Sequence, residues 1–313
     1  MSRGTRRVLR RVPRLVFRLT VVGVLLALTV SVGVRAGAPP AGAAASRAPS
    51  VSWDALAPGL ETASIPWDSG DAYPLVIVRV DPARWELELL CRDALGLSSG
   101  LTAREWCERY NLTAAINAGM FGEDYVTHVG FLRAGDHTNN PRKNAYRSVA
   151  VFGPRDPDRA PFRIHDLDDP TVDWERLVAG YDHVVQNLRL IKRPGRNRWS
   201  KQDRRWSEAA LGEDDRGRAL LIMSRTPQSM RDLNDRLVSL GIGVVCAQHL
   251  EGGPEAQLYV AAGGRSYQGF GSYETGFRED DGNRRAWPIP NVIGVRPRGT
   301  GREGGAGEGR TPS

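Results

Sequence analysis

Two glycine-containing strings carry polar residues of the types that bind and transform small ligands. The string AINAGMF places Asn117 at the end of an apolar run and before Gly119, and HLEGGPE places Glu251 before Gly252 and Gly253. Glycine allows the backbone to approach a ligand closely, and polar residues at strand ends often line functional clefts. A carboxylate offers proton transfer and an amide offers hydrogen bonds, so both strings are candidate parts of one site.

Two further strings add a cation and a pair of amides. RSVAVFG begins with Arg147, whose guanidinium can hold a phosphate or a carboxylate through two parallel hydrogen bonds. VVQNLRL carries Gln186 and Asn187 side by side in an apolar run. Since neighbouring side chains of a strand face opposite ways, one of the two amides is expected to face inward.

Each string also has a purely structural explanation. Asn117 could cap a turn, with Gly119 serving turn geometry alone. Glu251 could be a solvated hairpin residue, and Arg147 a surface cation at a strand end. The two adjacent amides could be one buried, hydrogen-bonded group and one exposed group. No single string decides between a functional and a structural explanation.

The elements that must position these residues are mostly strands. Apolar alternation predicts a hairpin over residues 74–90, a strand over 147–153 and a strand over 183–192. WSEAALG and RALLIMSR predict two strands joined by the polar turn EDDRG. IGVVCAQHL and AQLYV predict strands on either side of EGGPE.

Two helices are marked by their caps. Residues 101–111 begin with Thr102 and Glu105 in the spacing of a capping box. Residues 226–240 are expected to begin at Thr226, with Pro227 in the first turn, and to bury a stripe of leucines. Many strands, few helices and short connections predict an α+β fold around a large, mainly antiparallel or mixed sheet.

The two ends of the chain differ in composition from the middle. Residues 1–35 combine a basic start with the apolar run 19–34, which is typical of a signal peptide or of a signal anchor. Residues 36–50 are rich in Ala and Pro and predict a disordered tether, and the Gly-rich residues 299–313 predict a disordered tail. The sequence thus predicts an exported, periplasmic or extracellular domain over residues 51–298. Cleavage of the signal and anchoring through residues 19–34 both stay open, and any membrane contact is expected only through this N-terminal segment.

Charge and cysteine content narrow the function classes. The formal net charge is +7, but seven arginines lie within the first eighteen residues and the rest of the chain is balanced. We therefore expect no nucleic-acid partner. Cys91, Cys107 and Cys246 are an odd number: a Cys91–Cys107 disulfide is one alternative, and three small buried side chains are the other.

The order of AINAGMF, RSVAVFG, SEAALGEDDRGRALLIMSR, HLEGGPEAQLYV and PNVIGVRP resembles the phosphodiester glycosidase family over roughly residues 72–297. The resemblance places Asn117 and Gly119 in a segment that lines the family's site, and Arg147 at the start of a family strand. Glu251 stands where the family usually has Asp, before two matching glycines. Pro254 and Glu255 also depart from the family pattern, which indicates a divergent branch with a shifted substrate or with lost catalysis.

The resemblance implies cleavage of the bond between the anomeric carbon of a sugar and a phosphodiester oxygen. Such a reaction needs a carboxylate near the anomeric carbon, and donors that hold the phosphate. We assign the carboxylate to Glu251, with Glu208 as second candidate. The expected substrate ligands are Arg147 and Lys192 for the phosphate, Asn117, Gln186 and Asn187 for sugar hydroxyls, and Gly119, Gly252 and Gly253 for close backbone approach.

Other roles stay open in the sequence. His128, His137 and His249 lie near these strings and could assist, and Asp136 with His137 could join a metal site, although their spacing is not diagnostic. We expect no cofactor and no metal, and a phosphorylated or phosphodiester-linked carbohydrate as partner. The main rival is a catalytically inactive carbohydrate-binding envelope protein. An esterase or peptidase is disfavoured because neither G-x-S-x-G nor H-E-x-x-H occurs.

Overall fold

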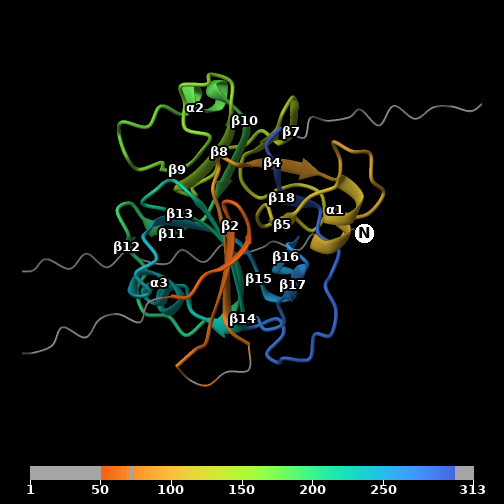
Figure 1. Cartoon of the computed structure of the whole chain (residues 1–313), viewed down its shortest axis with the longest axis vertical. Coiled ribbons are helices and arrows are strands. Elements are labelled where there is room, and N and C mark those ends of the chain that lie inside the picture. The colour runs from red at the N-terminus through yellow and green to blue at the C-terminus, as the bar shows by residue number, and fades with distance from the viewer. Residues whose placement is uncertain (1–50, 69, 71–72, 300–313) are drawn as a thin grey trace, which may run out of the picture. The chain divides into compact units, whose positions relative to one another are not determined.

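The computed structural model describes residues 51–68, 70 and 73–299. The predicted export segment, the tether and all but the first residue of the tail lie outside these residues. The described chain forms three β-sheets in which every strand pair is antiparallel, with three short α-helices packed against them (Figure 1). The predicted α+β class is confirmed, with the strands divided between one large sheet and two smaller ones.

The large sheet has eight strands in the order β1-β2-β3-β14-β13-β15-β11-β12. Its strands are β1 (Asp54–Ala57), β2 (Leu60–Ile65), β3 (Leu75–Val80), β11 (Arg189–Lys192), β12 (Arg196–Asn197), β13 (Trp206–Asp214), β14 (Ala219–Gln228) and β15 (Val244–Gly252). The central strands β13 and β14 form the predicted hairpin. Their apolar runs are almost continuous, which fits strands that are buried on both faces of the sheet.

The two smaller sheets have five strands each, in the orders β17-β16-β5-β18-β4 and β7-β6-β10-β8-β9. The first is built from β4 (Trp85–Cys91), β5 (Ala114–Asn117), β16 (Gln257–Ala262), β17 (Arg265–Phe270) and β18 (Asn291–Pro297). The second is built from β6 (Leu132–Ala134), β7 (His137–Asn140), β8 (Ser148–Pro154), β9 (Phe162–Asp166) and β10 (Tyr181–Asn187).

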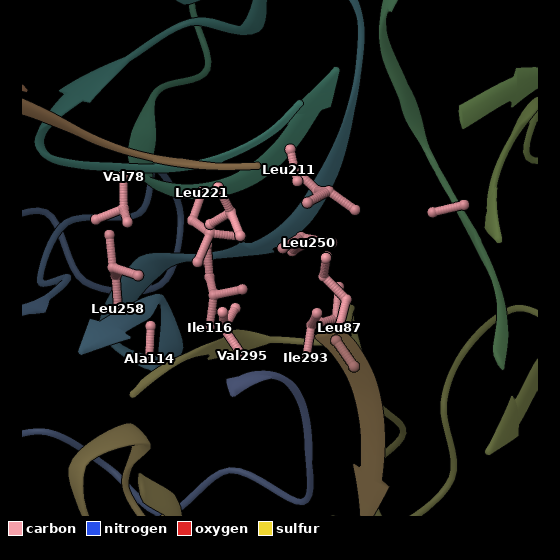
Figure 2. Close-up of a cluster of buried hydrophobic side chains, with 14 of the residues drawn as sticks. Val78, Leu87, Ala114, Ile116, Leu211, Leu221, Leu250, Leu258, Ile293 and Val295 are labelled. Atoms are coloured by element: carbon pink, nitrogen blue, oxygen red, sulfur yellow. The ribbon is translucent and has the colours of Figure 1, made fainter. Parts of the chain in front are cut away.

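The main core lies between the large sheet and the sheet that contains β5. Figure 2 shows its apolar side chains, with Leu211, Leu221 and Leu250 from the large sheet facing Ile116 and Leu258 from the other. All five are fully buried. The apolar side chains of both sheets are thus removed from water and closely packed. This packing fixes the positions of the two sheets and of the polar residues at the ends of their strands.

Three α-helices cover the sheets: α1 (Ala103–Tyr110), α2 (Trp174–Gly180) and α3 (Met230–Ser239), besides a short 3₁₀ helix η1 (Gly253–Glu255). The capping box of α1 is confirmed, since Thr102 and Glu105 bond each other's backbone N–H. The predicted start of α3 is wrong: β14 continues to Gln228, and the cap is Ser229. Within the described residues, no helix has the length and apolar content needed to cross a membrane.

Two strand predictions are also corrected. The hairpin over 74–90 is wrong, because β3 pairs with β2 and β14, whereas β4 pairs with β18 in another sheet. The single strand over 183–192 divides at Leu188 into β10 and β11, which belong to different sheets. Local apolar alternation cannot distinguish a strand that returns beside its neighbour from one that crosses to a second sheet.

All three cysteines are free and buried. The alternative of three small buried side chains is therefore confirmed, and the Cys91–Cys107 disulfide is wrong. Cys91 lies in β4 and Cys107 in α1, each within a different apolar cluster.

Candidate active site

Four strand ends place the polar residues in one region. In antiparallel pairing the start of β13 lies beside the end of β15, so that Glu208 is opposite Gly252 and Ala209 is opposite Glu251. The end of β10 reaches the same region, because the backbone N–H of His249 donates to Leu188 just after that strand. The end of β5 joins it through Asn117, whose side chain contacts the backbone of Glu255.

Glu208 and His249 form a buried acid–imidazole pair. One carboxylate oxygen of Glu208 lies 2.6 Å from His249 Nδ1, and the other accepts a hydrogen bond from Trp206 Nε1 at 2.5 Å. Their side chains are 2% and 5% exposed, which means that neither charge is screened by solvent. His249 Nε2 has no hydrogen-bond partner among the described residues, so this nitrogen is free to exchange a proton with a ligand.

Glu251 follows His249 by two residues, across a bulge. The register between β13 and β15 shifts there, with Leu250 as the extra residue of β15. A bulge re-aims side chains and is common beside active sites. Leu250 is buried in the main core, whereas Glu251 is only partly buried and lies close to His249 in the site.

The pKa values of Glu251 and His249 both differ from those of the free side chains. Burial raises the pKa of Glu251 to about 8; His249 and the N–H of Gly252 oppose this rise, and Glu255 and Glu274 add to it. Burial alone would lower the pKa of His249, but the adjacent Glu208 outweighs burial and raises it. At pH 7 Glu251 is therefore mainly protonated and can donate a proton.

The two glycines after Glu251 are required by close packing. A Cβ on Gly252 would lie 3.0 Å from Cδ1 of Trp206, and one on Gly253 would lie 2.7 Å from Oε2 of Glu274. Gly253 also has φ +65°, which strains other residues. The turn thus brings the Glu274 carboxylate against the backbone that carries Glu251.

The side chains of Asn117 and Gln186 are fully engaged with backbone groups. Asn117 donates to the carbonyl of Glu255 at 3.0 Å and accepts from the N–H of Gln257 at 2.6 Å. Gln186 accepts from the N–H of Phe131 and of Asn144, and donates to two carbonyls of the loop before β8. Both therefore hold the walls of the site in place, and their predicted contact with sugar hydroxyls stays a prediction.

Asn187, Gly119 and His128 meet at one point. Asn187 donates to the carbonyl of Ala118 at 2.8 Å. A Cβ on Gly119 would lie 2.2 Å from His128 Nε2 and 2.3 Å from Asn187 Oδ1, so only a glycine fits. Among the described residues, neither of these two buried atoms has a hydrogen bond of good geometry. Burial lowers the pKa of His128 to about 4, which keeps its ring neutral.

Arg147 and Lys192 lie on a different cluster. Both pair with Asp168, Arg147 Nη1 at 3.7 Å and Lys192 Nζ at 3.0 Å, and Arg189 joins them at 2.6 Å. Lys192 lines a separate cleft of about 580 Å³ beside β9 and α2. The neighbour of Arg147, Tyr146, approaches Glu251 instead, since that carboxylate adds to burial in raising the pKa of Tyr146. The predicted phosphate contacts of both cations stay a prediction.

His137 lies outside the site and pairs with Asp93 at 2.8 Å. Asp136, the other residue of that alternative metal site, is its neighbour in the chain. Within the part of the chain that the structure describes, no group of three His, Cys, Asp or Glu side chains is arranged to hold a metal ion.

Comparison with known proteins decides the family. The sequence profile of the phosphodiester glycosidase family matches residues 110–296, more than half of the chain. The chain belongs to this family. The match spans the candidate site from Asn117 to Glu274 and the strands from β5 to β18, and it begins after β4; the family is one of glycosidase-type phosphodiester hydrolases.

One solved structure supports the fold. The catalytic domain of zebrafish N-acetylglucosamine-1-phosphodiester alpha-N-acetylglucosaminidase, auto-inhibited by its pro-peptide, superposes with a TM-score of 0.53 at 15% identity, covering 79% of this chain and 86% of that one. A hypothetical protein from Synechocystis gives a TM-score of 0.49 at 14% identity, covering 79% and 64%. No curated protein matches the sequence. At these identities the first likeness supports the fold alone.

Three residues of the candidate site were not predicted from the sequence. They are Tyr146, Trp206 and Glu274, which contact or approach Glu208 and Glu251. Trp206 stands at the first position of a predicted strand, two residues before Glu208, and this spacing could have suggested it. Glu274 lies in a loop without periodicity, and no pattern in the sequence points to it.

Proposed function

We propose that the protein hydrolyses sugar 1-phosphodiesters at the site formed by Glu208, His249 and Glu251. The observation that carries the proposal is the position of a proton donor beside a carboxylate-oriented imidazole. Glu251 is mainly protonated near neutral pH, while the Glu208–His249 pair leaves Nε2 of the imidazole free. A proton donor beside a proton acceptor is what glycoside hydrolysis requires.

In the proposed reaction His249 Nε2, in its neutral form, takes a proton from water as the water oxygen attacks the anomeric carbon. The bond between that carbon and the phosphodiester oxygen breaks, and its electron pair leaves with the phosphate monoester. Glu251 gives its proton to the departing oxygen. Glu208 keeps its negative charge and stabilises the imidazolium that forms on His249.

The raised pKa changes the role that the sequence gave to Glu251. We predicted a carboxylate that stabilises positive charge at the anomeric carbon or directs water, but a mainly protonated group serves better as a donor. It also avoids repulsion of the phosphodiester, which is itself an anion. Glu208, the second candidate, acts in this proposal by holding His249 rather than by touching the sugar.

The ligands of the phosphate and of the sugar are taken over from the sequence predictions. Arg147 and Lys192 remain its predicted phosphate ligands, and either would have to exchange Asp168 for the substrate. Asn187, with an unpartnered Oδ1 beside Gly119, remains a predicted ligand of a sugar hydroxyl.

The test is release of sugar or phosphate monoester from a synthetic N-acetylglucosamine 1-phosphodiester. We expect Glu251→Gln and His249→Asn each to lower kcat by about 10²–10⁴-fold, the usual contribution of one acid or base. Unchanged turnover in both variants would sink the proposal. Saturable binding without any product from the native chain would identify the rival, a non-catalytic carbohydrate-binding protein.

We further propose that the protein is exported through residues 1–35, because their basic start and apolar run match an export signal. A chain that carries a C-terminal reporter should then be found outside the cytoplasm. Replacement of Leu25 and Leu26 by Arg should retain it inside, and an unaltered distribution would refute this assignment.

A further inference from the structure

A second cleft, of about 730 Å³, lies beside the N-terminal end of α1, and Glu251 is not among the residues that line it. Its walls include Arg92 after β4, Tyr125 in the loop between β5 and β6, and Arg285 and Trp287 before β18. This volume falls in the range of pockets that bind small ligands. None of its lining residues takes part in the proposed proton transfers.

Tyr125 is presented to solvent in a strained conformation. Its side chain is 51% exposed, and its φ is +54°, a region that bulky residues rarely adopt. Asn111, which has a similar φ, is explained by its position as the C-cap of α1; no such cap explains Tyr125. Strain of this kind persists only where the surroundings impose it, and it concentrates at functional sites.

The surroundings do hold Tyr125 firmly. Arg92 Nη1 donates to its carbonyl at 2.9 Å, and its own N–H donates to Gly122 at 2.9 Å. The ring rests against Phe121, with centroids 5.4 Å apart, and Phe121 packs on the buried cluster beneath. A rigid, exposed aromatic ring supplies contact area at little entropic cost, which suits it to bind the face of a ligand ring.

The cleft also carries positive charge that the protein does not neutralise. Among the described residues, the exposed guanidinium of Arg285 has neither an ion pair nor a hydrogen-bond partner. The one carboxylate on the lining, that of Glu105, accepts from Thr102 in the cap of α1. With Arg92 and Arg285 against this one carboxylate, the lining keeps an excess of positive charge in a cleft that Tyr125 and Trp287 also line.

The walls of the cleft continue into the candidate active site. The loop that carries Tyr125 begins at Gly119 and returns through His128, which meet at Asn187. On the other wall, Gln257 donates to the carbonyl of Trp287 and binds the side chain of Asn117 through its own N–H.

We infer that the cleft of Arg92, Tyr125, Arg285 and Trp287 is a binding subsite for an anionic saccharide. A sugar ring lies against Tyr125 and Trp287, and its negatively charged substituent binds Arg285. The subsite adds to the proposed function by taking a second, charged part of a glycan outside the catalytic pocket, but its binding does not depend on hydrolysis.

The test uses the full chain labelled with 5-fluorotryptophan and ¹⁹F NMR. Trp287→Phe assigns the resonance of Trp287 among the eight tryptophans. Trehalose 6-phosphate and trehalose serve as charged and neutral probes. We expect a saturable shift of the Trp287 resonance with the phosphorylated sugar, and affinity for unphosphorylated trehalose about tenfold weaker, as expected for one charge-assisted hydrogen-bonded contact.

Two variants and two controls decide the result. Arg285→Gln and Tyr125→Asn should each weaken binding of trehalose 6-phosphate about tenfold. Asn accepts a positive φ more readily than Tyr, so Tyr125→Asn should keep or raise the melting temperature while binding falls. Arg216→Gln and Phe277→Ala remove an exposed cation and an aromatic that is 64% exposed elsewhere, and should leave binding unchanged.

The inference is overturned if the Trp287 resonance shows no saturable shift, or if both subsite variants bind like the native chain. Equal affinity for trehalose and trehalose 6-phosphate would overturn the assignment of an anionic ligand. Because no turnover is measured, loss of this subsite would leave the proposed hydrolysis standing, and an inactive enzyme would leave the subsite standing.

Discussion

The displaced pKa of Glu251 predicts a stability change that depends on pH. Its pKa rises from 4.5 to about 8 on folding, so between these pH values the folded chain holds a proton that the unfolded chain has released. Stability must therefore fall as pH rises through this window. Glu251→Gln keeps the shape and the neutral charge of the protonated side chain, and thereby removes the pH-dependent cost.

The size of the effect follows from the shift. At 1.36 kcal/mol per pH unit, the full displacement corresponds to about 5 kcal/mol, and solvent at the exposed edge of Glu251 reduces this to about 3 kcal/mol. For a domain of this size, that energy changes the melting temperature by about 5–10 °C. Glu251→Gln should thus melt higher than the native chain at pH 9, and close to it at pH 5.

Thermal unfolding of both chains at several pH values between 5 and 9 measures the difference. Glu86→Gln, which neutralises an exposed carboxylate of β4, is the matched control and should show no such pH-dependent gain. A melting difference that stays constant from pH 5 to 9 would refute the argument, since it would mean that Glu251 is ionised in the folded chain as readily as in the unfolded one.

Three further outcomes are expected. First, kcat/KM should fall about tenfold per pH unit above pH 8, because Glu251 loses its proton there. Glu251→Gln should remove this alkaline limb along with most of the activity. If the limb persists in the variant, it belongs to the titration of another group. Second, Glu208→Gln should lower kcat more than KM. It should also shift the acid limb of the pH profile to lower pH, because His249 loses the neighbour that raises its pKa. If this limb does not move, Glu208 does not act through His249. Third, Gly119→Ala should destabilise the fold by about 1–3 kcal/mol in chemical unfolding, because the added Cβ meets His128 and Asn187. Gly135 has open space around it, so Gly135→Ala should cost about 1 kcal/mol for its positive φ alone.

Local patterns in the sequence predicted those parts of the fold that local chemistry determines. The cap of α1 needs only Thr102 and Glu105, and the hairpin of β13 and β14 needs only two apolar runs and a polar turn. The failures at 74–90 and at Leu188 concern which sheet a strand joins. That choice depends on contacts outside the local sequence: β4 pairs with β18, near the end of the described chain, and β10 and β11 pair with β8 and β15.

The candidate site shows the same division. Glycine turns and carboxylates identified Glu208, Glu251 and the two glycines, because close backbone approach restricts the residue type. The direction of a side chain is not visible in the sequence: Arg147 has the right charge and the right neighbour, but its guanidinium points to Asp168. Likewise, Glu274 approaches Glu251 only because an irregular loop returns to the turn.

The departure from Asp to Glu at position 251 has a physical explanation in this arrangement. The longer side chain reaches back to the N–H of Gly252 at 3.1 Å and stays beside His249, and the charges of Glu255 and Glu274 add to the rise of its pKa. Three ionised carboxylates in so small a space would repel one another and any phosphodiester. With Glu251 protonated, the carboxylate of Glu208 is the charge held against His249, at 2.6 Å, and it is compensated whenever His249 is protonated. In the proposed reaction, protonated Glu251 therefore adds no charge that repels the phosphodiester, and its ionisation as pH rises through about 8 would remove the proton donor and add that repulsion.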